Sequence, residues 1–537
     1  MRLKQAALAD PVPWLARGYQ LPKFNRAAVA AATAAAPQWV HFGAGNIFRA
    51  FPAALAQTLL EQGVMDRGII VAEGYDGEII EKAYRPMDNL SLNVTLKSDG
   101  SIDKTVLGSV TESWVASPGT ADWQRLLELF AAPSLQLASF TITEKGYCLT
   151  DPQGTYLPAV LRDFAAGPQA PESYLGKLAA LCYHRFLAGG APLSLVSMDN
   201  CSHNGARLSQ AVSAYACRWE DGGLVQPGFS AYLQDPKKIG FPWSMIDKIT
   251  PRPDAKVKSM LEADGFEDTE AIVTTKNTYV APFVNAEQTQ YLVIEDWFPN
   301  GRPPLERAGV MFTDRRTVEL TEKMKVGTCL NPLHTAMALF GCLLGYSRIS
   351  DEMQDPDIVE LIKTVGYTEG LPVAVNPGIL DPKEFLDTVV GVRFVNPYLP
   401  DTPQRIATDT SQKLAVRFGE TLKAYLASRS LRIESLRAMP LVFAAFCRYH
   451  LGVDDQGRSM ALSPDPLGPE LAQALAGIRL GEPGPFHDRL APILSNAEIF
   501  GVDLYQAGLG PRVEALFARM TAGSGAVRNT LRETLCC

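Results

Sequence analysis

The sequence has little of what marks membrane, secreted or nucleic-acid-binding proteins. No stretch approaches the ~20 consecutive apolar residues that a membrane span requires. The first residues, MRLKQAALADPVPW, lack the sustained apolar segment of a secretion signal. The net charge of −8 disfavours nucleic acid or an anionic membrane as a partner, because negative charges repel. These absences predict a cytoplasmic protein that acts on a small molecule and has no nucleic-acid or membrane partner.

Metal-binding and disulfide patterns are also missing. The six histidines and nine cysteines form no ladder with the spacing of metal ligands, so we expect no metal site. Several cysteines lie within apolar runs, which is typical of reduced, buried thiols in a cytoplasmic protein. The cysteines are Cys148, Cys182, Cys201, Cys217, Cys329, Cys342, Cys447, Cys536 and Cys537.

Length and patterning predict two domains. A chain of 537 residues is too long for one hydrophobic core. Strand-like runs alternate with helical stretches in the first part, which indicates a parallel α/β sheet. These runs are QWVHF, GIIVAE, SLNVTL, LQLASFTIT, LSLVSM and YLVIEDW. A segment rich in proline and glycine, 297–312, then precedes mainly helical patterns. We therefore place the domains at 1–312 and 313–537.

A glycine turn after the strand at 38–42 predicts a dinucleotide-binding βαβ unit. The turn GAGN is followed by a helical pattern in which Ile47, Phe51, Leu55 and Leu59 share one face. Gly43 permits the tight turn, and Gly45 lets backbone N–H groups approach a pyrophosphate. The third glycine of the usual G-x-G-x-x-G is replaced by Phe48. The alternative is a plain turn between a strand and a helix.

The next strand brings acidic residues to the position of the adenine ribose. Glu73 ends GIIVAE and Asp76 follows in the loop. A carboxylate there accepts a hydrogen bond from the ribose 2′-hydroxyl and repels a 2′-phosphate, so we favour NAD over NADP. Lys82 and Arg85 lie downstream and leave NADP open. In the alternative interpretation both acids are merely solvated.

Polar clusters follow two further strands. TITEKGYC and SMDNCSHNG place Thr143, Glu144, Asp199, Asn200 and Asn204 beyond carboxyl strand ends, where ligands of open α/β sheets bind. Asn-Gly and Asp-Asn are also common turn formers, and this alone accounts for Asn204-Gly205. A third polar cluster is MIDKITP at 245–251.

The segment TEKMKVGTCLNPLHTAM, 321–337, sets Lys325, Asn331 and His334 close together. Lysine serves as a catalytic acid or base only where its site lowers its pKa from the ordinary ~10.4. Asn331-Pro332 predicts a helix N-cap followed by the first helical position, with Lys325 on the preceding turn. The alternative gives Asn331 only a capping role, His334 a place in the core and Lys325 a solvated face.

Taken together, six motifs in order resemble the polyol-specific long-chain dehydrogenases, the mannitol dehydrogenase family. They are GAGNIFRA, TITEKGY, SMDNCSHNG, MIDKITP, EKMKVGTCLNPLH and RFVNP, within residues 38–450. The resemblance implies that Lys325 is the catalytic lysine and that Asn331, His334 and Asn200 assist it. It also implies that Asp247 and Arg393 bind substrate, and we add Glu144 to that set.

The sequence departs from the family pattern in three places. The interval from lysine to asparagine is K-x5-N, one residue longer than the usual K-x4-N. The basic residue often found eight or nine positions after the arginine of R-F-x-N-P is absent. Phe48 stands where many members carry histidine.

The family resemblance implies an α/β fold with a Rossmann-like NAD-binding domain and a mainly helical substrate and catalytic domain. It implies a metal-independent, NAD(H)-dependent oxidoreductase acting on a sugar acid or polyol. We favour hexuronate reduction of the fructuronate-to-mannonate type over mannitol or arabinitol oxidation, and a non-catalytic NAD-binding regulator is an alternative of another class. We expect a monomer or small homo-oligomer. The predicted cofactor-binding residues are Gly43, Gly45, Asn46, Ile47, Glu73, Asp76 and Thr143.

Overall fold

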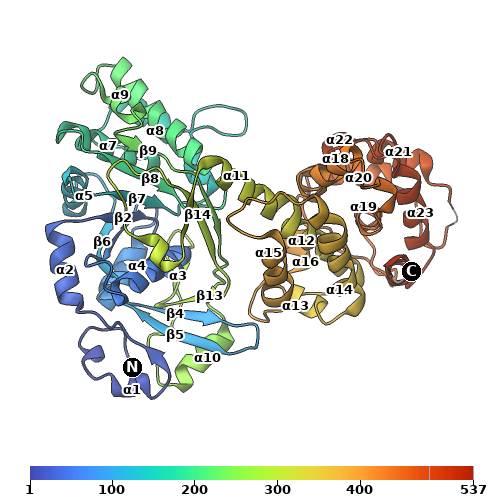
Figure 1. Ribbon diagram of the computed structural model, residues 1–537, viewed down its shortest axis with the longest axis horizontal. Coiled ribbons are helices and arrows are strands. Elements are labelled where there is room, and N and C mark those ends of the chain that lie inside the picture. Colours follow the sequence, from blue (N-terminus) through green and yellow to red (C-terminus); the bar gives the residue numbers. More distant parts are fainter. Residues whose placement is uncertain (483, 536–537) are drawn as a thin grey trace. The chain divides into compact units, whose positions relative to one another are not determined.

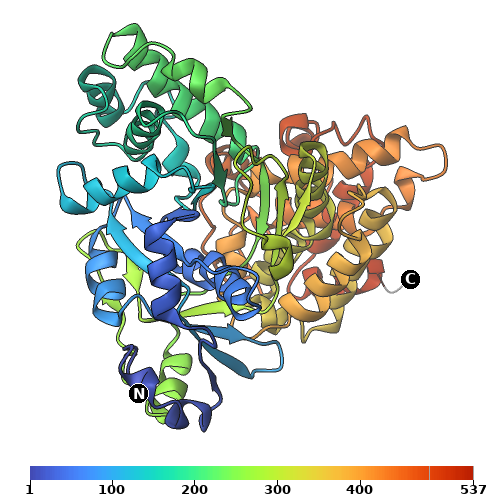
Figure 2. The same ribbon diagram turned by 60° about the vertical axis from the view of Figure 1, so that its left-hand side comes forward.

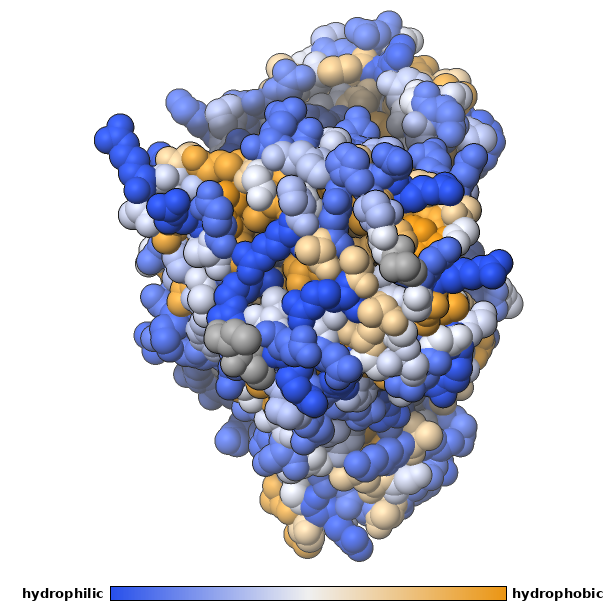
Figure 3. Space-filling model, turned by 90° about the vertical axis from the view of Figure 1, so that its right-hand side faces the viewer, coloured by the Kyte–Doolittle hydropathy of each residue, from blue (hydrophilic) through white to orange (hydrophobic). Residues whose placement is uncertain are grey.

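Two units make up the chain in the computed structural model, which describes residues 1–482 and 484–535 (Figure 1). The N-terminal unit contains Met1–Lys97 and Ser101–Glu319. The C-terminal unit contains Ser98–Gly100 and the chain from Leu320 onward. Figure 3 shows one face of the molecule, on which hydrophilic side chains dominate and apolar ones gather in small, separate patches.

A six-stranded parallel sheet is the centre of the N-terminal unit. Its strands, in spatial order, are β6 (Val110–Val115), β3 (Ile69–Glu73), β2 (Trp39–Phe42), β7 (Leu137–Phe140), β8 (Leu193–Ser197) and β9 (Ile239–Gly240). All five pairings are parallel. In chain order these strands are arranged 3-2-1-4-5-6, so the direction of winding reverses between β2 and β7. That order is typical of dinucleotide-binding folds, whose ligand lies at the reversal.

Helices cover both faces of this sheet, which explains why its central strands are almost wholly apolar. Val40 and Phe42 of β2 pack with α5 (Ala121–Ala131), α7 (Tyr174–Leu187) and α8 (Asn204–Asp221). Trp39, on the opposite face of the same strand, packs with α2 (Arg26–Ala35) and α4 (Pro52–Glu61). Successive side chains of β2 therefore point to opposite faces of the sheet and pack into two separate hydrophobic cores, as the period of two residues in a strand requires.

Two strands that we assigned to the parallel sheet belong elsewhere. SLNVTL forms β4 (Ser91–Leu96) in a mixed sheet with β1 (Tyr19–Gln20), β5 (Ile102–Leu107) and β13 (Phe283–Glu287). YLVIE forms β14 (Tyr291–Glu295), antiparallel to β10 (Ser244–Asp247) and parallel to β15 (Met311–Thr313). A short antiparallel pair, β11 (Ile272–Val273) and β12 (Tyr279–Val280), completes the strands of the described residues. The assignment was wrong because an apolar run predicts a strand but not its partner.

The helix expected after the glycine turn is broken into two. α3 (Asn46–Ala50) and α4 meet at Phe51, whose φ of −129° and ψ of −74° are not helical. Pro52 is the cause, since proline lacks an N–H and its ring clashes with the preceding turn. Phe51, Leu55 and Leu59 are nevertheless buried on one face, as the spacing predicted.

The C-terminal unit is built from helices, drawn from yellow to red in Figures 1 and 2. Its longer helices are α12 (Asn331–Leu344), α14 (Pro356–Lys363), α15 (Pro382–Thr388), α18 (Glu420–Ala427), α19 (Ala438–Tyr449), α20 (Gly468–Ala474), α21 (His487–Leu494), α23 (Gly510–Met520) and α24 (Ala526–Leu535). Every residue of α19 is buried, and α12, α23 and α24 pack around it. The helical second half predicted from sequence is confirmed.

One continuous helical run extends from Arg315 to Leu344 and comprises α11 (Arg315–Met324), a π-helical turn and α12. By length and composition it meets the criterion for a membrane span, although none was expected from the sequence. Core helices of soluble proteins meet the same criterion, and 78% of its most apolar window is buried.

Candidate active site

A cavity of about 570 Å³ lies at the carboxyl ends of β2, β3 and β7, where the winding of the sheet reverses. The turn after β2 and the loops after β3 and β7 line it, together with Tyr174 and Thr278. Five of the seven predicted cofactor-binding residues are part of its wall: Gly43, Gly45, Glu73, Asp76 and Thr143. The cavity thus brings together residues that are distant in the sequence, from Gly43 to Thr278.

The two glycines have different surroundings. Gly43 has a φ of +108°, and a Cβ there would overlap the carbonyl oxygen of Thr141. Only glycine fits this position without strain. A Cβ at Gly45 would meet no atom within 4 Å and would extend into open space. Gly43 is therefore required by the fold, whereas Gly45 leaves room that a bound pyrophosphate can fill.

Glu73 joins the glycine turn to the loop after β3. One carboxylate oxygen accepts from the N–H of Ala44 at 2.8 Å. The other accepts from the N–H groups of Tyr75 and Asp76 at 2.7 and 3.1 Å. A carboxylate offers about four acceptor positions, so one is left for a ligand hydroxyl. The solvated-acid alternative is wrong for Glu73 and Asp76, which are 5% and 2% exposed.

Two lysines lie beside the loop after β3. Lys177 donates to the carbonyl of Gly74 at 2.8 Å, and Lys276 lies 4.3 Å from the ring of Tyr75. Burial, and then the charge of Lys276, lower the pKa of Lys177. Asp76 accepts a hydrogen bond from Thr274 at 2.6 Å.

Asp199 fixes the loop that follows β7. Its carboxylate accepts from the N–H groups of Ile142 and Thr143 at 2.8 and 2.9 Å and from the hydroxyl of Tyr147 at 2.6 Å. Thr143 is held at a φ of +67°, a strained conformation for a β-branched residue. Burial raises the pKa of Asp199. Glu144, next along this loop, is exposed and forms an ion pair with Arg207 at 2.7 Å.

Asn204, which we considered as a ligand contact, has a structural position instead. It is fully buried, and its amide nitrogen donates to the carbonyls of Asp199 and Ser244 at 3.0 and 2.9 Å. Its amide oxygen accepts from the N–H of Ser244 at 3.0 Å. These bonds tie the loop after β8 to the start of β10, the strand that ends at Asp247.

The remaining predicted residues of the N-terminal unit lie around these loops. Asn200 is exposed in the loop after β8, and Asp247 is 7% exposed. Asn46 begins α3 and accepts from the guanidinium of Arg49 at 2.8 Å. Ile47 packs against the hydrophobic core beneath β2. Asn46 and Ile47 are not among the residues that line the cavity.

In the C-terminal unit, Lys325 begins a π-helical turn, Lys325–Cys329, between α11 and α12. Its carbonyl accepts from the N–H of Leu330, five residues on, at 3.0 Å. A π turn holds one residue more than an α turn, so it accommodates the extra residue of the K-x5-N spacing. Lys325 is 2% exposed, which overturns the alternative of a solvated lysine.

Asn331 was expected to cap α12, and this was wrong. Leu330 occupies the cap position, and no side chain makes a capping hydrogen bond. The N–H of His334 donates to Leu330 at 3.1 Å, and that of Leu330 to Lys325. Because the π turn already supplies these acceptors, the helix continues instead of starting afresh, and the Asn331 side chain is not used as a cap.

His334 lies in a cationic environment. Its Nε2 is 3.8 Å from a carboxylate oxygen of Asp401, and its ring packs 4.6 Å from that of Phe394. Burial lowers the pKa of His334 to about 4, Asp401 opposes this, and Arg393, Arg417 and Arg405 reinforce it. His334 is therefore neutral near pH 7. Arg393, 2% exposed, ends another π-helical turn, Val389–Arg393.

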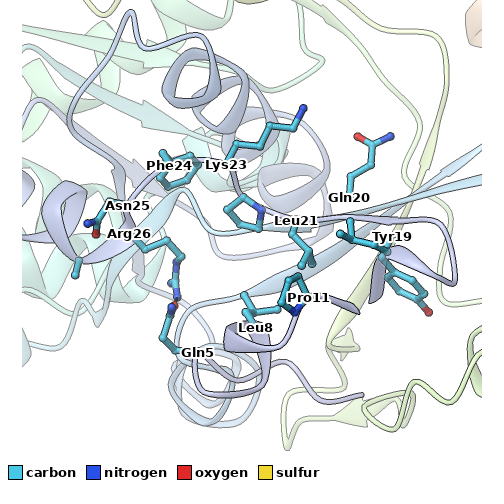
Figure 4. A pocket seen from close by; sticks show the side chains of 13 residues that line it. Gln5, Leu8, Pro11, Tyr19, Gln20, Leu21, Lys23, Phe24, Asn25 and Arg26 are labelled. Atoms are coloured by element: carbon cyan, nitrogen blue, oxygen red, sulfur yellow. Dashed lines mark hydrogen bonds between the residues drawn. The ribbon is translucent and has the colours of Figure 1, made fainter. Parts of the chain in front are cut away.

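Among residues 1–482 and 484–535, no group of three or more histidine, cysteine, aspartate or glutamate side chains is placed to hold a metal ion. The seven cysteines within these ranges are free thiols, while Cys536 and Cys537 lie outside them. A separate cavity of about 640 Å³ lies in the N-terminal segment, between Gln5 and Ala27 (Figure 4). Arg26 donates to Gln5 at its edge, and no predicted site residue lines it.

Sequence reasoning missed residues that line the cavity and a buried histidine that bonds to one of them. His41 is buried in β2, where it bonds Ser139 and Thr141 at 2.7 and 2.8 Å, and burial lowers its pKa to about 3. Tyr174 and Thr278 reach the cavity from distant segments, so no local sequence pattern predicts that they line it.

Comparisons with known proteins agree with this architecture. The sequence profile of the mannitol dehydrogenase Rossmann domain matches residues 37–307, and that of the mannitol dehydrogenase C-terminal domain matches residues 317–519. D-mannonate oxidoreductase of Thermotoga maritima is 52% identical over 537 residues, which are 100% of this chain and 99% of that protein. Mannitol 2-dehydrogenase of Pyrenophora tritici-repentis is 31% identical over 82% of this chain and 73% of that protein.

Among solved structures, the ternary complex of Pseudomonas fluorescens mannitol 2-dehydrogenase with NAD and D-mannitol is similar throughout. It is 27% identical, the match covers 100% of both chains, and the TM-score is 0.68. The resemblance drawn from the motifs is thereby confirmed: the chain belongs to the mannitol dehydrogenase family.

Proposed function

We propose that this protein is an NAD(H)-dependent oxidoreductase that interconverts a hexuronate and its hexonate, of the fructuronate and mannonate type. The observation that carries the proposal is the 52% identity, over the full length of both chains, to a D-mannonate oxidoreductase. The chain's family acts on CH–OH groups of polyols and sugar acids, and the named relatives are oxidoreductases of that kind.

The cavity of the N-terminal unit fits a dinucleotide. Gly45 leaves open space beside the turn after β2, and Glu73 keeps an acceptor position for a ribose hydroxyl. The buried carboxylates of Glu73 and Asp76 disfavour a 2′-phosphate, which supports NAD over NADP. When bound, the nicotinamide supplies or accepts the hydride.

Proton transfer falls to Lys325 in this proposal. In reduction its ammonium donates a proton to the oxygen of the substrate carbonyl, and in oxidation its neutral amine takes that proton back. The family resemblance assigns to Asn200 and to Asn331 the donation of a hydrogen bond to a substrate oxygen as charge develops on it, worth about 2.7–4 kcal/mol per donor in comparable sites. It assigns the orientation of other substrate groups to neutral His334, Asp247 and Arg393, and we add Glu144.

A second candidate is oxidation of a neutral polyol, favoured by the 31% identity to a mannitol 2-dehydrogenase. A non-catalytic NAD-binding regulator is a third, which a buried lysine at the start of a π turn argues against. Such a regulator has no need of a general base. Cytoplasmic location and a monomeric or small homo-oligomeric state stay predictions.

The test is NADH consumption at neutral pH with D-fructuronate, D-tagaturonate, D-fructose and D-xylulose, repeated with NADPH. We expect turnover of a uronate with NADH. Turnover of neutral ketoses alone would move the protein to the polyol dehydrogenases. Tight NADH binding without turnover of any of the four would favour the regulator.

A further inference from the structure

Arg417 lies on a helical turn that packs against the turn of the proposed proton donor, although no motif includes it. It is the third residue of a π-helical turn, Ala415–Gly419, which packs against the π-helical turn that begins at Lys325. The carbonyl oxygen of Val416 lies 3.8 Å from where a Cβ on Gly327 would stand. The two turns are therefore in close contact.

The Arg417 side chain points to the first turn of α12. Its Nη1 donates to the hydroxyl of Thr335 at 2.5 Å, and that hydroxyl donates to the carbonyl of Asn331 at 3.0 Å. The positive charge of Arg417 also helps to lower the pKa of His334. Arg417 thus lies within electrostatic reach of the helix turn that carries Asn331 and His334.

The Arg417 guanidinium is poorly paired. It carries five N–H donors, and among the described residues it makes one hydrogen bond and has no carboxylate within 4.0 Å. Burial lowers its pKa to about 10, so the surroundings desolvate the cation. A buried charge without an anion is unfavourable, and such charges are normally paired.

Other buried arginines of this chain show the contrast. Arg185 donates to five backbone carbonyls and Arg448 to three. Even Arg405, whose side chain is 65% exposed, is paired with Asp401. Arg417 has neither kind of compensation, and the residue as a whole is half-buried, so part of its surface is exposed.

We propose that Arg417 binds the carboxylate of the substrate and thereby selects a sugar acid over a neutral polyol. Arginine suits this role because its planar fork matches a carboxylate with two hydrogen bonds. The residue would replace the basic group that the sequence lacks eight or nine positions after Arg393. This inference rests on the proposed function, since a neutral polyol has no anion to offer.

The test compares D-mannonate with D-mannonamide, which differs in carrying an amide in place of the carboxylate. In Arg417→Gln we expect kcat/KM for mannonate oxidation with NAD to fall at least about thirtyfold, mainly through KM, as for loss of a desolvated charge pair. We expect kcat/KM for mannonamide and the NADH dissociation constant to change less than about threefold, because neither ligand uses the charge.

Lys413→Gln is the matched control. Lys413 is a cation four residues earlier whose pKa is sensitive to Arg417, and its amine donates to the carbonyl of Thr408. Its neutralisation lowers the local positive charge by the same amount and should leave the preference for mannonate over mannonamide in place. If Lys413→Gln lost this preference to the same extent as Arg417→Gln, the effect of Arg417 would come from the positive electrostatic potential of the region and not from direct binding of the carboxylate. That result would overturn the assignment.

The remaining outcomes separate the two proposals. Equal losses on mannonate and mannonamide, or no loss on either, would contradict carboxylate binding by Arg417 while the proposed function stands. If the unaltered enzyme fails to oxidise mannonate and to reduce fructuronate, the proposed function itself fails. Arg417→Lys provides the test should the glutamine variant not fold: it keeps the charge but not the fork, and we expect a raised KM for mannonate alone.

Discussion

At the residue scale, Lys325 carries the chemical step of the proposal. It is buried, so Lys325→Met removes the ammonium and keeps most of the packing volume. We expect kcat to fall by about 10²–10⁴, the usual contribution of a positioned acid or base. The NADH dissociation constant, measured by fluorescence, should be unchanged. Lys323→Met, two residues earlier on an exposed side chain, is the control. Lost NADH affinity with preserved turnover would remove Lys325 from the chemistry.

The two glycines of the turn after β2 should have different effects when they are replaced, one on protein stability and the other on NADH binding. Gly43→Ala should lower the thermal midpoint, because a Cβ at a φ of +108° overlaps the Thr141 carbonyl. Gly45→Val should leave the midpoint nearly unchanged and weaken NADH binding, because its side chain would occupy the open space of the cavity. Calorimetry and NADH titration of both variants check this. Unchanged NADH affinity in Gly45→Val would place the cofactor elsewhere.

At the scale of elements, three of the four π-helical turns described in the C-terminal unit each hold a cation that the proposals use, while the fourth, Thr364–Gly370, holds none. The three turns span Lys325–Cys329, Val389–Arg393 and Ala415–Gly419, and they hold Lys325, Arg393 and Arg417. Such turns are rare and occur often at functional sites, where the extra residue redirects a side chain. The spacing K-x5-N was a sequence signal for the first of them. The other two had no such signal.

Deleting Val326 tests the first turn. The deletion would convert it to an α turn and rotate Lys325 relative to α12 by about 100°, since an α-helix has 3.6 residues per turn. We expect turnover to fall at least about a hundredfold, because misplacement by about 1 Å already has that effect. Helical content by circular dichroism should be retained. Val326→Ala, which keeps the length, should be close to normal. Full activity after deletion would show that the π turn does not set the lysine's position.

At the scale of the whole molecule, buried histidines make stability depend on pH. Burial lowers the pKa of His41 to about 3 and those of His334 and His450 to about 4. Each is neutral when folded, whereas the unfolded chain takes up a proton as the pH falls below about 6.5. The unfolded state then binds more protons, so stability is full above pH 6.5 and is lost as the pH falls toward 4.

We therefore expect the urea midpoint to fall between pH 7.5 and pH 5. The contribution of His450 is on the order of 3 kcal/mol in full. His450→Phe tests it, because neither ring nitrogen of this buried histidine has a hydrogen-bond partner among the described residues. The variant should show a weaker dependence on pH. An identical dependence in both proteins would exclude His450 as a contributor.

Features that depend on neighbouring residues could be predicted from the amino-acid sequence. These include the strand, glycine turn and helix of the βαβ unit, the acids after β3, the helical second half and the motif around Lys325. Local sterics and periodicity fix such elements. The break between helices α3 and α4 at Phe51 could also have been predicted from the adjacent Pro52, but we did not predict it.

Three features depended on how the chain packs in three dimensions: which strands share a sheet, which residues line the cavity and which side chains lack partners. β4 and β14 look like members of the parallel sheet but pair elsewhere, and Tyr174 and Thr278 reach the cavity from remote segments. The proposed role of Arg417 likewise depends on the packing of two helical turns that are far apart in the sequence. The physical reason is that pairing and burial join residues far apart in the chain, and no local pattern records which distant group will be the partner.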